Sequence, residues 1–363
     1  MFIYMCYKYW HNSVHPSFYH SGKFLKLDKI TEMRFKPSFL LCNGFLQTCY
    51  ISIASKFAKK LEFDKEVFKY SDGGQTYLDW KFPENKTKGI CMILPGLTGN
   101  CNDIYVISAA KEALKNGYIA VVCNHRGVPG LKISSPKLYC AASSWDLREI
   151  VDYIHSKYPD EKLYCIGFSL GANIIGKYLG EEKSESKITS AVCINSPLQM
   201  FKIDLDSVYF GFFTRILCNN VKRKIREHIY LEDELKKTHG VSMTEVLEKS
   251  KTLKEIDHNL TAKLFGYGSA DNYYLKAASS NFIESIETPT LFICALDDPV
   301  SLKECIPYSS FPSEHKRDDG NEHIALLTTN GGGHCAHFTS VFSGSQWFNK
   351  PAFHFLEHTN KQD

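Results

Sequence analysis

One serine of the sequence lies in a pattern that is typical of an enzyme nucleophile. Ser169 is the centre of Gly-Phe-Ser-Leu-Gly at 167–171, which follows an apolar run at 163–166 and opens a helical stretch at 172–179. On such a sharp strand-to-helix turn the hydroxyl is exposed, and small residues two positions away relieve the crowding of the backbone. The N-terminus of the helix then points at negative charge that develops beside the serine. The pattern therefore predicts a nucleophile rather than an ordinary turn serine.

A serine hydroxyl needs a general base, and the base needs a carboxylate that orients it. His334 follows the glycines at 331–333, and two aspartates, Asp297 and Asp298, follow the apolar run at 291–295. Taken singly, an Asp-Pro pair can simply start a turn, and a histidine after glycines can be a surface residue. The order Ser, Asp, His, each after a strand, is the one found with a nucleophile elbow, and it predicts a triad.

Acyl transfer also needs hydrogen-bond donors for the oxyanion. The apolar run at 90–94 ends in the loop Pro-Gly-Leu-Thr-Gly at 95–99. In hydrolases with a nucleophile elbow this loop supplies one backbone N–H, and the residue after the nucleophile supplies the other. The oxyanion donors expected here are therefore the backbone N–H groups of Leu97 and Leu170.

The chain around these residues alternates between short apolar runs and helical stretches. Such alternation predicts a mostly parallel sheet that helices cover on both faces. Strands are expected at 90–94, 119–123, 163–166, 188–194, 291–295 and 323–328, and helices at 104–116, 144–157 and 172–179. A hairpin of residues 67–70 and 77–80 is expected before them. The predicted fold class is α/β, with an eight-stranded sheet flanked by helices.

Two segments depart from this alternation. Residues 1–60 are aromatic-rich and irregular, and they are expected to form an N-terminal extension. Residues 198–284 contain no convincing core strand, and they are expected to form an inserted helical cap. The core of the fold is then expected to consist of residues 61–197 and 285–363.

The composition excludes several classes of protein. The charge balance, 43 Lys and Arg against 40 Asp and Glu, lacks the basic excess of a nucleic-acid binder. A run of about 18 apolar residues, as a membrane span needs, is missing. The thirteen cysteines form no C-x-x-C pair, which favours buried thiols over a disulfide framework. Without the features of a signal peptide, the chain is expected to be cytoplasmic or peripherally attached to a membrane.

The sequence gives no sign of a cofactor or a metal site. The glycines at 331–333 lack the following helix and the spacing of a dinucleotide fingerprint. Of the other histidines, His125 is expected to shape the floor of the pocket and His337, three residues after His334, to be structural. No cofactor and no metal are therefore expected.

Several motifs together resemble the α/β-hydrolase-domain proteins 1 to 3. They are the segments 95–99, 124–127, 167–171, 297–299 and 332–334, with further likeness at 43–48 and 72–80. The resemblance runs from Pro37 to the end of the chain, and the stretch 167–181 is most similar to the type 2 member, a monoacylglycerol lipase. It implies a serine lipase or esterase for acylglycerols or phospholipids, with Ser169, Asp298 and His334 as the triad. Asp298 is preferred over Asp297 because family members place the acid directly before proline.

The expected function is hydrolysis of lipid esters through an acyl-enzyme on Ser169. Two alternatives remain open at this point. The same residues would serve a general carboxylesterase or a thioesterase, and a protein of this fold can also hold a lipid or steroid without catalysis.

A contact with membranes is expected to involve the cap. Family members usually carry a membrane-spanning anchor, which the sequence lacks, whereas apolar residues of the cap lie close to a basic stretch at 222–226. Apolar side chains can insert into a bilayer while cations gain free energy beside anionic lipids. The apolar residues in question are Phe210, Phe212, Phe213 and Ile216. A solvated helix face beside core aromatics is the alternative interpretation.

Overall fold

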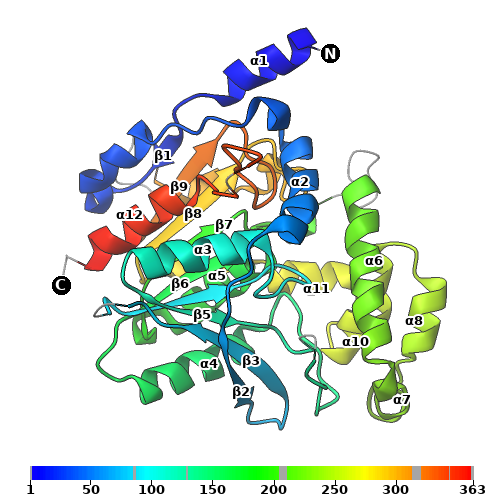
Figure 1. Cartoon of the computed structure of the whole chain (residues 1–363). Helices are drawn as coiled ribbons and strands as arrows, with labels where there is room; N and C mark the ends of the chain where they lie inside the picture. The colour runs from blue at the N-terminus through cyan, green and yellow to red at the C-terminus, as the bar shows by residue number, and fades with distance from the viewer. Residues whose placement is uncertain are drawn as a thin grey trace.

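A nine-stranded sheet runs through the computed structural model, which describes residues 2–84, 87–127, 130–203, 211–312, 320–342 and 344–360 (Figure 1). The strand order is β1-β9-β8-β7-β6-β4-β5-β3-β2. Strands β4 to β9 pair in parallel, whereas β1, β2 and β3 join the sheet by antiparallel pairing. The bounds are β1 Ser17–Tyr19, β2 Asp64–Lys69, β3 Gln75–Lys81, β4 Ile90–Leu94, β5 Ile119–Cys123, β6 Leu163–Phe168, β7 Ile188–Ile194, β8 Thr290–Ala295 and β9 Ile324–Thr329.

All six expected parallel strands are present, and three of them, β4, β5 and β7, have the expected bounds. Nearly every residue of these six strands is buried, which explains why they are continuous apolar runs in the sequence. The sheet has one strand more than the expected eight. The additional strand is β1, which pairs with residues 326–328 of β9.

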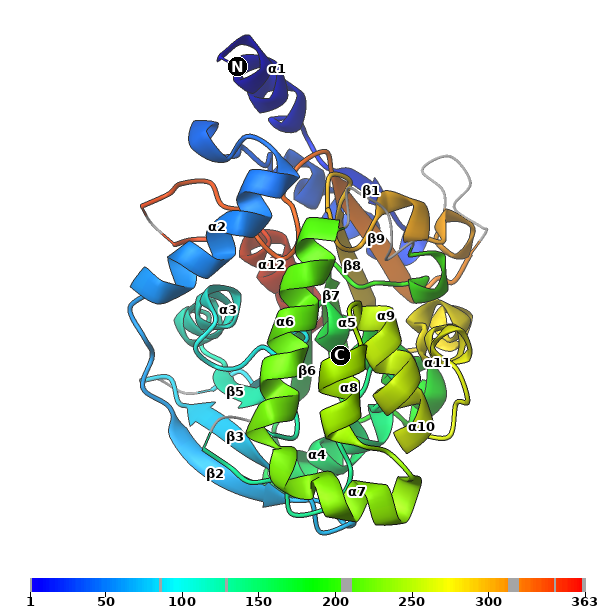
Figure 2. The same ribbon diagram turned by 90° about the vertical axis from the view of Figure 1, so that its right-hand side faces the viewer.

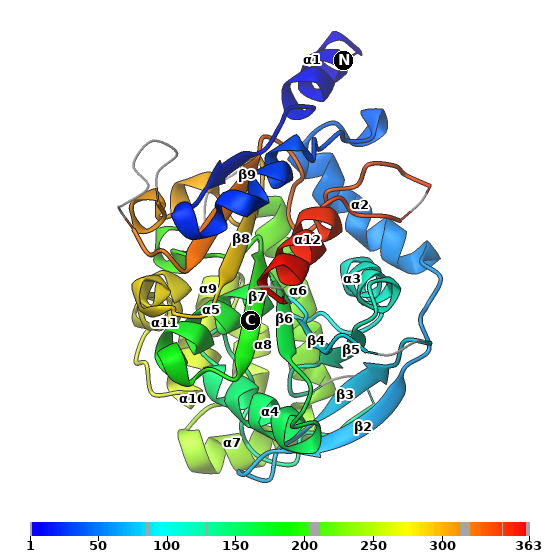
Figure 3. The same ribbon diagram turned by 90° about the vertical axis from the view of Figure 1, so that its left-hand side faces the viewer.

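Helices cover both faces of the sheet. On one face α4 (Ser144–Lys157) and α5 (Leu170–Glu182) bury side chains in the larger apolar cluster. On the other face α3 (Ile104–Lys115) and α12 (Asn349–Asn360) lie side by side and contribute to the second cluster (Figure 3). The α/β class expected from the sequence is confirmed.

The segment that was expected as an N-terminal extension contributes to the core. Besides β1, it forms α1 (Phe2–Asn12), a 3-10 helix at Gly22–Glu32 and α2 (Gly44–Phe57). Phe18, Phe24, Leu27, Ile30 and Phe35 are buried in the same cluster as the side chains of α3 and α12. The first part of the chain therefore packs on the sheet, and only α1 projects from it (Figure 1).

A group of helices lies between β7 and β8. They are α6 (Gly211–Glu227), α7 (Glu232–His239), α8 (Met243–Lys249), α9 (Leu253–Ile256), α10 (Ala262–Leu264) and α11 (Ala270–Ala277). Figure 2 shows α6, α8 and α9 side by side in front of the sheet. They share an apolar cluster of their own, which includes Cys218, Leu235, Met243 and Leu260. Between β7 and β8 the described residues form helices and no strand.

Two further properties bear on the sequence-based expectations. None of the helices formed by the described residues is long and apolar enough to cross a bilayer. All thirteen cysteines are free, and all but Cys6 and Cys49 are buried, in agreement with the expectation of buried thiols.

Candidate active site

Ser169 lies at the sharp turn between β6 and α5, and its φ of 51° is in the left-handed region. Such a backbone conformation is strained for a residue with a side chain, and it is typical of functional turns. The two flanking glycines make the turn possible. A Cβ atom on Gly171 would lie 2.5 Å from the carbonyl oxygen of Leu94, and one on Gly167 would lie 2.7 Å from the backbone nitrogen of Ala172.

The structure brings the three residues of the expected triad together. His334 Nε2 lies 2.8 Å from Ser169 Oγ, and His334 Nδ1 lies 2.8 Å from Asp298 Oδ2. The Asp298 side chain is fully buried. In this arrangement the imidazole can remove the hydroxyl proton while the carboxylate holds the ring and stabilises the imidazolium. Serine, histidine and aspartate are thus placed for nucleophilic catalysis.

The carboxylate of Asp298 is held by groups that the sequence did not reveal. Asn195 Nδ2 donates to Oδ2 at 2.7 Å, and the backbone N–H groups of Val300 and Ser301 donate to Oδ1 at 2.7 and 2.9 Å. Asn195 Oδ1 also accepts the N–H of Cys335 at 3.2 Å. Asn195 therefore joins the aspartate loop to the histidine loop. Its place directly after β7 is the one signal in the sequence that could have pointed to it.

Asp297, the alternative acid, does not contact the imidazole. Its Oδ1 accepts the N–H of Gly333 at 2.9 Å, and its Oδ2 accepts from Asn12 Nδ2 at 3.3 Å. Burial raises the pKa of Asp297 to about 6, against the lowering effect of the N–H groups of Gly333 and Gly44. Asp297 thus braces the histidine loop against the N-terminal elements.

Helix α2 reaches the site through one threonine. Thr48 Oγ1 accepts the backbone N–H of His334 at 2.9 Å and donates to the carbonyl of Gly44 at 2.7 Å. The loop can approach α2 so closely because Gly333 has no side chain. At its φ of 61° a Cβ atom would lie 2.4 Å from the carbonyl oxygen of Gly44. Sequence reasoning missed this role: Thr48 ends the segment 43–48 that resembles the family, but nothing in that segment indicated a contact with the histidine loop.

The loop at 95–99 lies directly beside the nucleophile. A Cβ atom on Gly96 would be 3.3 Å from the Cβ of Ser169. The N–H of Gly96 donates to Tyr105 at 3.3 Å and that of Thr98 to Tyr139 at 3.0 Å. Between them, the N–H of Leu97 has no acceptor among the described residues.

The second expected oxyanion donor is the first residue of α5. The first N–H groups of a helix have no acceptor within it, so that of Leu170 is available to a ligand. Leu97 and Leu170 line the same cavity as Ser169. Their positions are therefore compatible with the expected oxyanion hole.

His125 supports the loop at 95–99 through its first residue, Pro95. Its Nε2 lies 3.0 Å from the carbonyl oxygen of Pro95, and its ring stacks on Tyr139 with centroids 4.4 Å apart and planes at 9°. Burial lowers the pKa of His125 to about 4, so the ring is neutral at pH 7 and Nε2–H can donate to Pro95. His125 and Tyr139 thus hold the two sides of the loop that contains Leu97.

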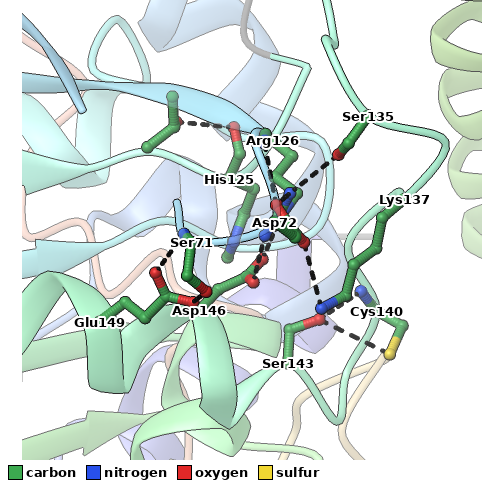
Figure 4. A network of polar contacts seen from close by, with 12 residues as sticks. Ser71, Asp72, His125, Arg126, Ser135, Lys137, Cys140, Ser143, Asp146 and Glu149 are labelled. Carbon is green, nitrogen blue, oxygen red and sulfur yellow. Dashed lines mark hydrogen bonds and ion pairs between the residues drawn. The ribbon is translucent and has the colours of Figure 1, made fainter. Parts of the chain in front are cut away.

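A buried arginine fixes the segment that carries His125 (Figure 4). Arg126 donates to both carboxylate oxygens of Asp146 at 2.8 Å and to Asp72 at 2.9 Å. Its guanidinium also lies 3.9 Å from the centroid of the Tyr70 ring. Bidentate arginine–carboxylate pairs are strongly directional. The network therefore ties the β5 loop to α4 and to the hairpin of β2 and β3.

A cavity of about 510 Å³ opens above Ser169, between the sheet and the helical insertion. One wall is the face of α6 from Phe212 to Ile225, which at 1.5 Å per residue extends over about 20 Å. Another wall is α2, through Thr48 and Ser52. The size is that of a small-molecule site, and the long apolar wall fits a chain-like ligand.

The remaining histidine of the C-terminal loop belongs to the core. His337 is buried, its Nε2 lies 3.0 Å from Thr329 Oγ1, and its ring stacks on Trp347. Burial lowers its pKa to about 3. This environment agrees with a structural role. Among the described residues no group of side chains is arranged to hold a metal ion.

Comparison with known proteins adds four findings. The model of the α/β hydrolase fold family matches residues 92–330. The chain is 29% identical to the monoacylglycerol lipase of Saccharomyces cerevisiae, over 88% of this chain and 79% of that protein. It is also 29% identical to the phospholipase ABHD3 of Mus musculus, over 78% of this chain and 68% of that protein. A Pyrococcus furiosus esterase shares the fold, with a TM-score of 0.50, 17% identity, and 82% and 91% of the two chains covered.

Proposed function

The chain belongs to the α/β hydrolase family and is a serine hydrolase, and from this premise we propose that it cleaves carboxylic esters of lipids. The observation that carries the proposal is the contact of His334 Nε2 with Ser169 Oγ at 2.8 Å, at the base of a long apolar cavity. Monoacylglycerols and related acylglycerols or phospholipids are the proposed substrates. The names of the two relatives support this choice.

In the proposed reaction His334 takes the proton of Ser169 as Oγ attacks the ester carbonyl. The backbone N–H groups of Leu97 and Leu170 stabilise the oxyanion of the tetrahedral intermediate. His334 then gives its proton to the leaving alcohol, and the acyl group stays on Ser169. A water molecule, deprotonated by the same imidazole, releases the fatty acid and restores the serine. Asp298 keeps the ring oriented throughout.

A fluorophosphonate probe and a substrate panel test the proposal together. The probe should label the wild-type chain and leave Ser169→Ala unlabelled. The panel contains monoacylglycerols, triacylglycerols, phosphatidylcholines, acyl thioesters and short p-nitrophenyl esters, and we expect the highest kcat/KM for a long-chain glycerolipid. Exclusive turnover of short esters or thioesters would identify a general carboxylesterase or thioesterase. An unlabelled Ser169 would leave only a binding role for lipid or steroid.

We also propose that the cap, residues 198–284, contacts the membrane from which the lipid is taken. The proposed location is the cytoplasm or, by peripheral attachment, the membrane surface. Phe212 and Ile216 support this proposal, because they line the cavity and are 51% and 40% exposed. Phe213 is buried, and Phe210 lies outside the described residues.

Fewer basic residues are available for the proposed contact than the sequence suggests, because two of those at 222–226 have partners within the protein. Lys222 donates to the carbonyl of Leu247 at 3.0 Å, and Lys224 pairs with Glu227 at 2.8 Å. Of the basic residues at 222–226, Arg223 and Arg226 are the exposed ones, and they are the cations of this stretch that we propose for contact with anionic lipid.

A further inference from the structure

A carboxyl group that the proposed reaction does not use lies in the wall of the cavity. Asp257 follows α9 and begins a π-helical turn, Asp257–Thr261. Tyr274 donates to its Oδ2 and Thr261 to its Oδ1, both at 2.7 Å. Single π turns are rare and occur frequently at functional sites.

The electrostatic environment of Asp257 is unusual for an aspartate. Among the described residues no lysine, arginine or histidine forms an ion pair with it, and only the two hydroxyls stabilise its charge. Burial raises its pKa to about 6, although the hydroxyls of Tyr274 and Thr261 act in the opposite direction. The side chain is nevertheless partly accessible, and it lines the cavity. Its remaining hydrogen-bonding capacity is therefore open to a ligand.

The surroundings decide what kind of ligand group can lie there. The cavity lining next to Asp257 along the chain is apolar, with Leu253, Ile256 and Leu260. A hydrocarbon chain placed over the carboxylate would remove it from water without compensation, which costs free energy. The ligand atom that faces Asp257 must therefore donate a hydrogen bond.

A hydroxyl group suits this position better than an ammonium group. An ammonium ion would add a further positive charge, at a desolvation cost, to a cavity whose lining already includes Arg126 and Lys224. A hydroxyl satisfies the free acceptor capacity of the carboxylate without adding charge. Asp257, Tyr274 and Thr261 can therefore accept a neutral polar group in an otherwise apolar wall.

The wall that contains Asp257 is linked by hydrogen bonds and chain neighbours to the loop at 95–99 beside Ser169. The N–H of Ala141 donates to the hydroxyl of Tyr273, the neighbour of Tyr274, at 2.8 Å. Ala141 lines the cavity two residues after Tyr139, which binds the loop at 95–99. A substrate hydroxyl bound at Asp257 is thus held against the side of the cavity that supports the proposed oxyanion loop.

We propose that Asp257 recognises a free hydroxyl group of the substrate, so that the site selects lipid esters that retain hydroxyls, such as those on the glycerol of a monoacylglycerol. This inference rests on the proposed hydrolysis of lipid esters and assigns a specificity-determining residue to it. The acyl chain then occupies the apolar remainder of the cavity along α6.

The test compares two esters of one fatty acid, the 1-monoacylglycerol and the methyl ester, which lacks hydroxyls. In the full-length Asp257→Asn variant we expect kcat/KM for the monoacylglycerol to fall about tenfold, mainly through KM, because a hydrogen bond to a charged acceptor is lost. For the methyl ester, kcat/KM of the variant should stay within about twofold of the wild-type value, because independent sites show interaction energies of only about 0.3–0.5 kcal/mol. Asp271→Asn is the matched control, since Asp271 is exposed on α11 and should affect neither ester.

Four results would overturn the proposal. An equal loss for both esters would mean that Asp257 only supports the cap, and unchanged kinetics would mean that it contacts no substrate. Lysophosphatidylcholine is assayed beside the two esters, and a loss confined to it would assign Asp257 to a cationic head group instead. If the wild type, though labelled by fluorophosphonate, cleaves neither ester, this inference fails, and the lipid-ester function fails with it only if no lipid ester of the substrate panel is cleaved.

Discussion

The backbone N–H of His334 donates to Thr48 Oγ1, so a helix that precedes the hydrolase core holds the loop that carries the imidazole. Asp297 adds a second connection, because it binds Gly333 of the same loop and Asn12 at the end of α1. The N-terminal elements are therefore part of the framework that positions His334 against Ser169.

Replacing Thr48 tests this connection. Thr48→Val keeps the shape of the side chain but leaves the N–H of His334 without its acceptor, which typically costs about 1–3 kcal/mol. We expect kcat on a p-nitrophenyl ester to fall about tenfold, the rate equivalent of about 1.4 kcal/mol. Thr48→Ser keeps the hydroxyl and should retain most of the activity. Equal kcat values for the two variants would show that the bond does not position the histidine.

The two neighbouring aspartates should respond very differently to loss of their charge. Asp298→Asn removes the carboxylate that orients His334, and kcat should fall by about 10⁴, as in other triads. Asp297→Asn leaves the imidazole contacts in place and should be much milder. Steady-state kinetics of both variants, with Tm as a check on folding, gives the ranking. The opposite ranking would assign Asp297 as the acid of the triad.

If the loop at 95–99 supplies an oxyanion donor, as proposed, weakening its support should lower kcat without changing KM. Tyr139→Phe removes the acceptor of the Thr98 N–H but keeps the ring that stacks on His125. We expect kcat to fall about tenfold with KM unchanged, because a loosened donor acts on the transition state. Tyr308→Phe, at the other end of the sheet beside β1, serves as the control. A rise in KM alone would contradict the assignment to the loop.

The raised pKa of Asp297 predicts a pH dependence of stability. The pKa is about 6 in the folded protein, against about 3.9 in an unfolded chain, so the folded state binds the proton more tightly. Asp297 therefore makes its full contribution to the free energy of unfolding below pH 4, and this contribution is lost as the pH rises through 6. Its upper bound is about 3 kcal/mol. Urea unfolding between pH 4.5 and 7.5 should show a smaller decrease for Asp297→Asn than for wild type. Parallel curves would refute the shift.

The proposed contact of the cap with membranes predicts that charge reversal at two positions weakens binding. Arg223→Glu/Arg226→Glu should weaken sedimentation with anionic liposomes at low salt, because each cation contributes about 1 kcal/mol near such a surface. High salt should remove the difference. The matched control is Lys236→Glu/Lys237→Glu on α7, which changes the net charge equally on another exposed part of the cap. If both double variants bind like wild type, α6 is only a solvated face.

The sequence was informative where burial or backbone geometry leaves a strong pattern. Strands buried on both faces are continuous apolar runs, and Ser169, Asp298 and His334 each follow such a run. Strand β1 has three residues, too few for a pattern, and it forms because the edge of β9 offers it hydrogen bonds. Its existence could not be inferred without the partner strand.

Supporting residues were harder to find than the reacting groups. Asn195 also follows a strand, but an asparagine there has no motif attached to it. Thr48 and Asp257 reach the site through the tertiary packing of α2 and of the helices between β7 and β8, which local sequence does not specify. What distinguishes these three residues is the identity of their partners, and those partners lie far away along the chain.

The pairing of β1 with β9 has a consequence for how the chain is made. The ribosome synthesises the first strand early and its partner almost last, so β1 must wait until nearly the whole sheet has emerged. Until then the nascent protein carries an unpaired segment that contains Phe18, and a chain that lacked this segment would leave β9 as an open edge. Open strand edges recruit strands from other molecules. Because β1 pairs with residues 326–328 of β9 and is itself only three residues long, it leaves a shorter strand edge exposed than β9 would, which disfavours self-association.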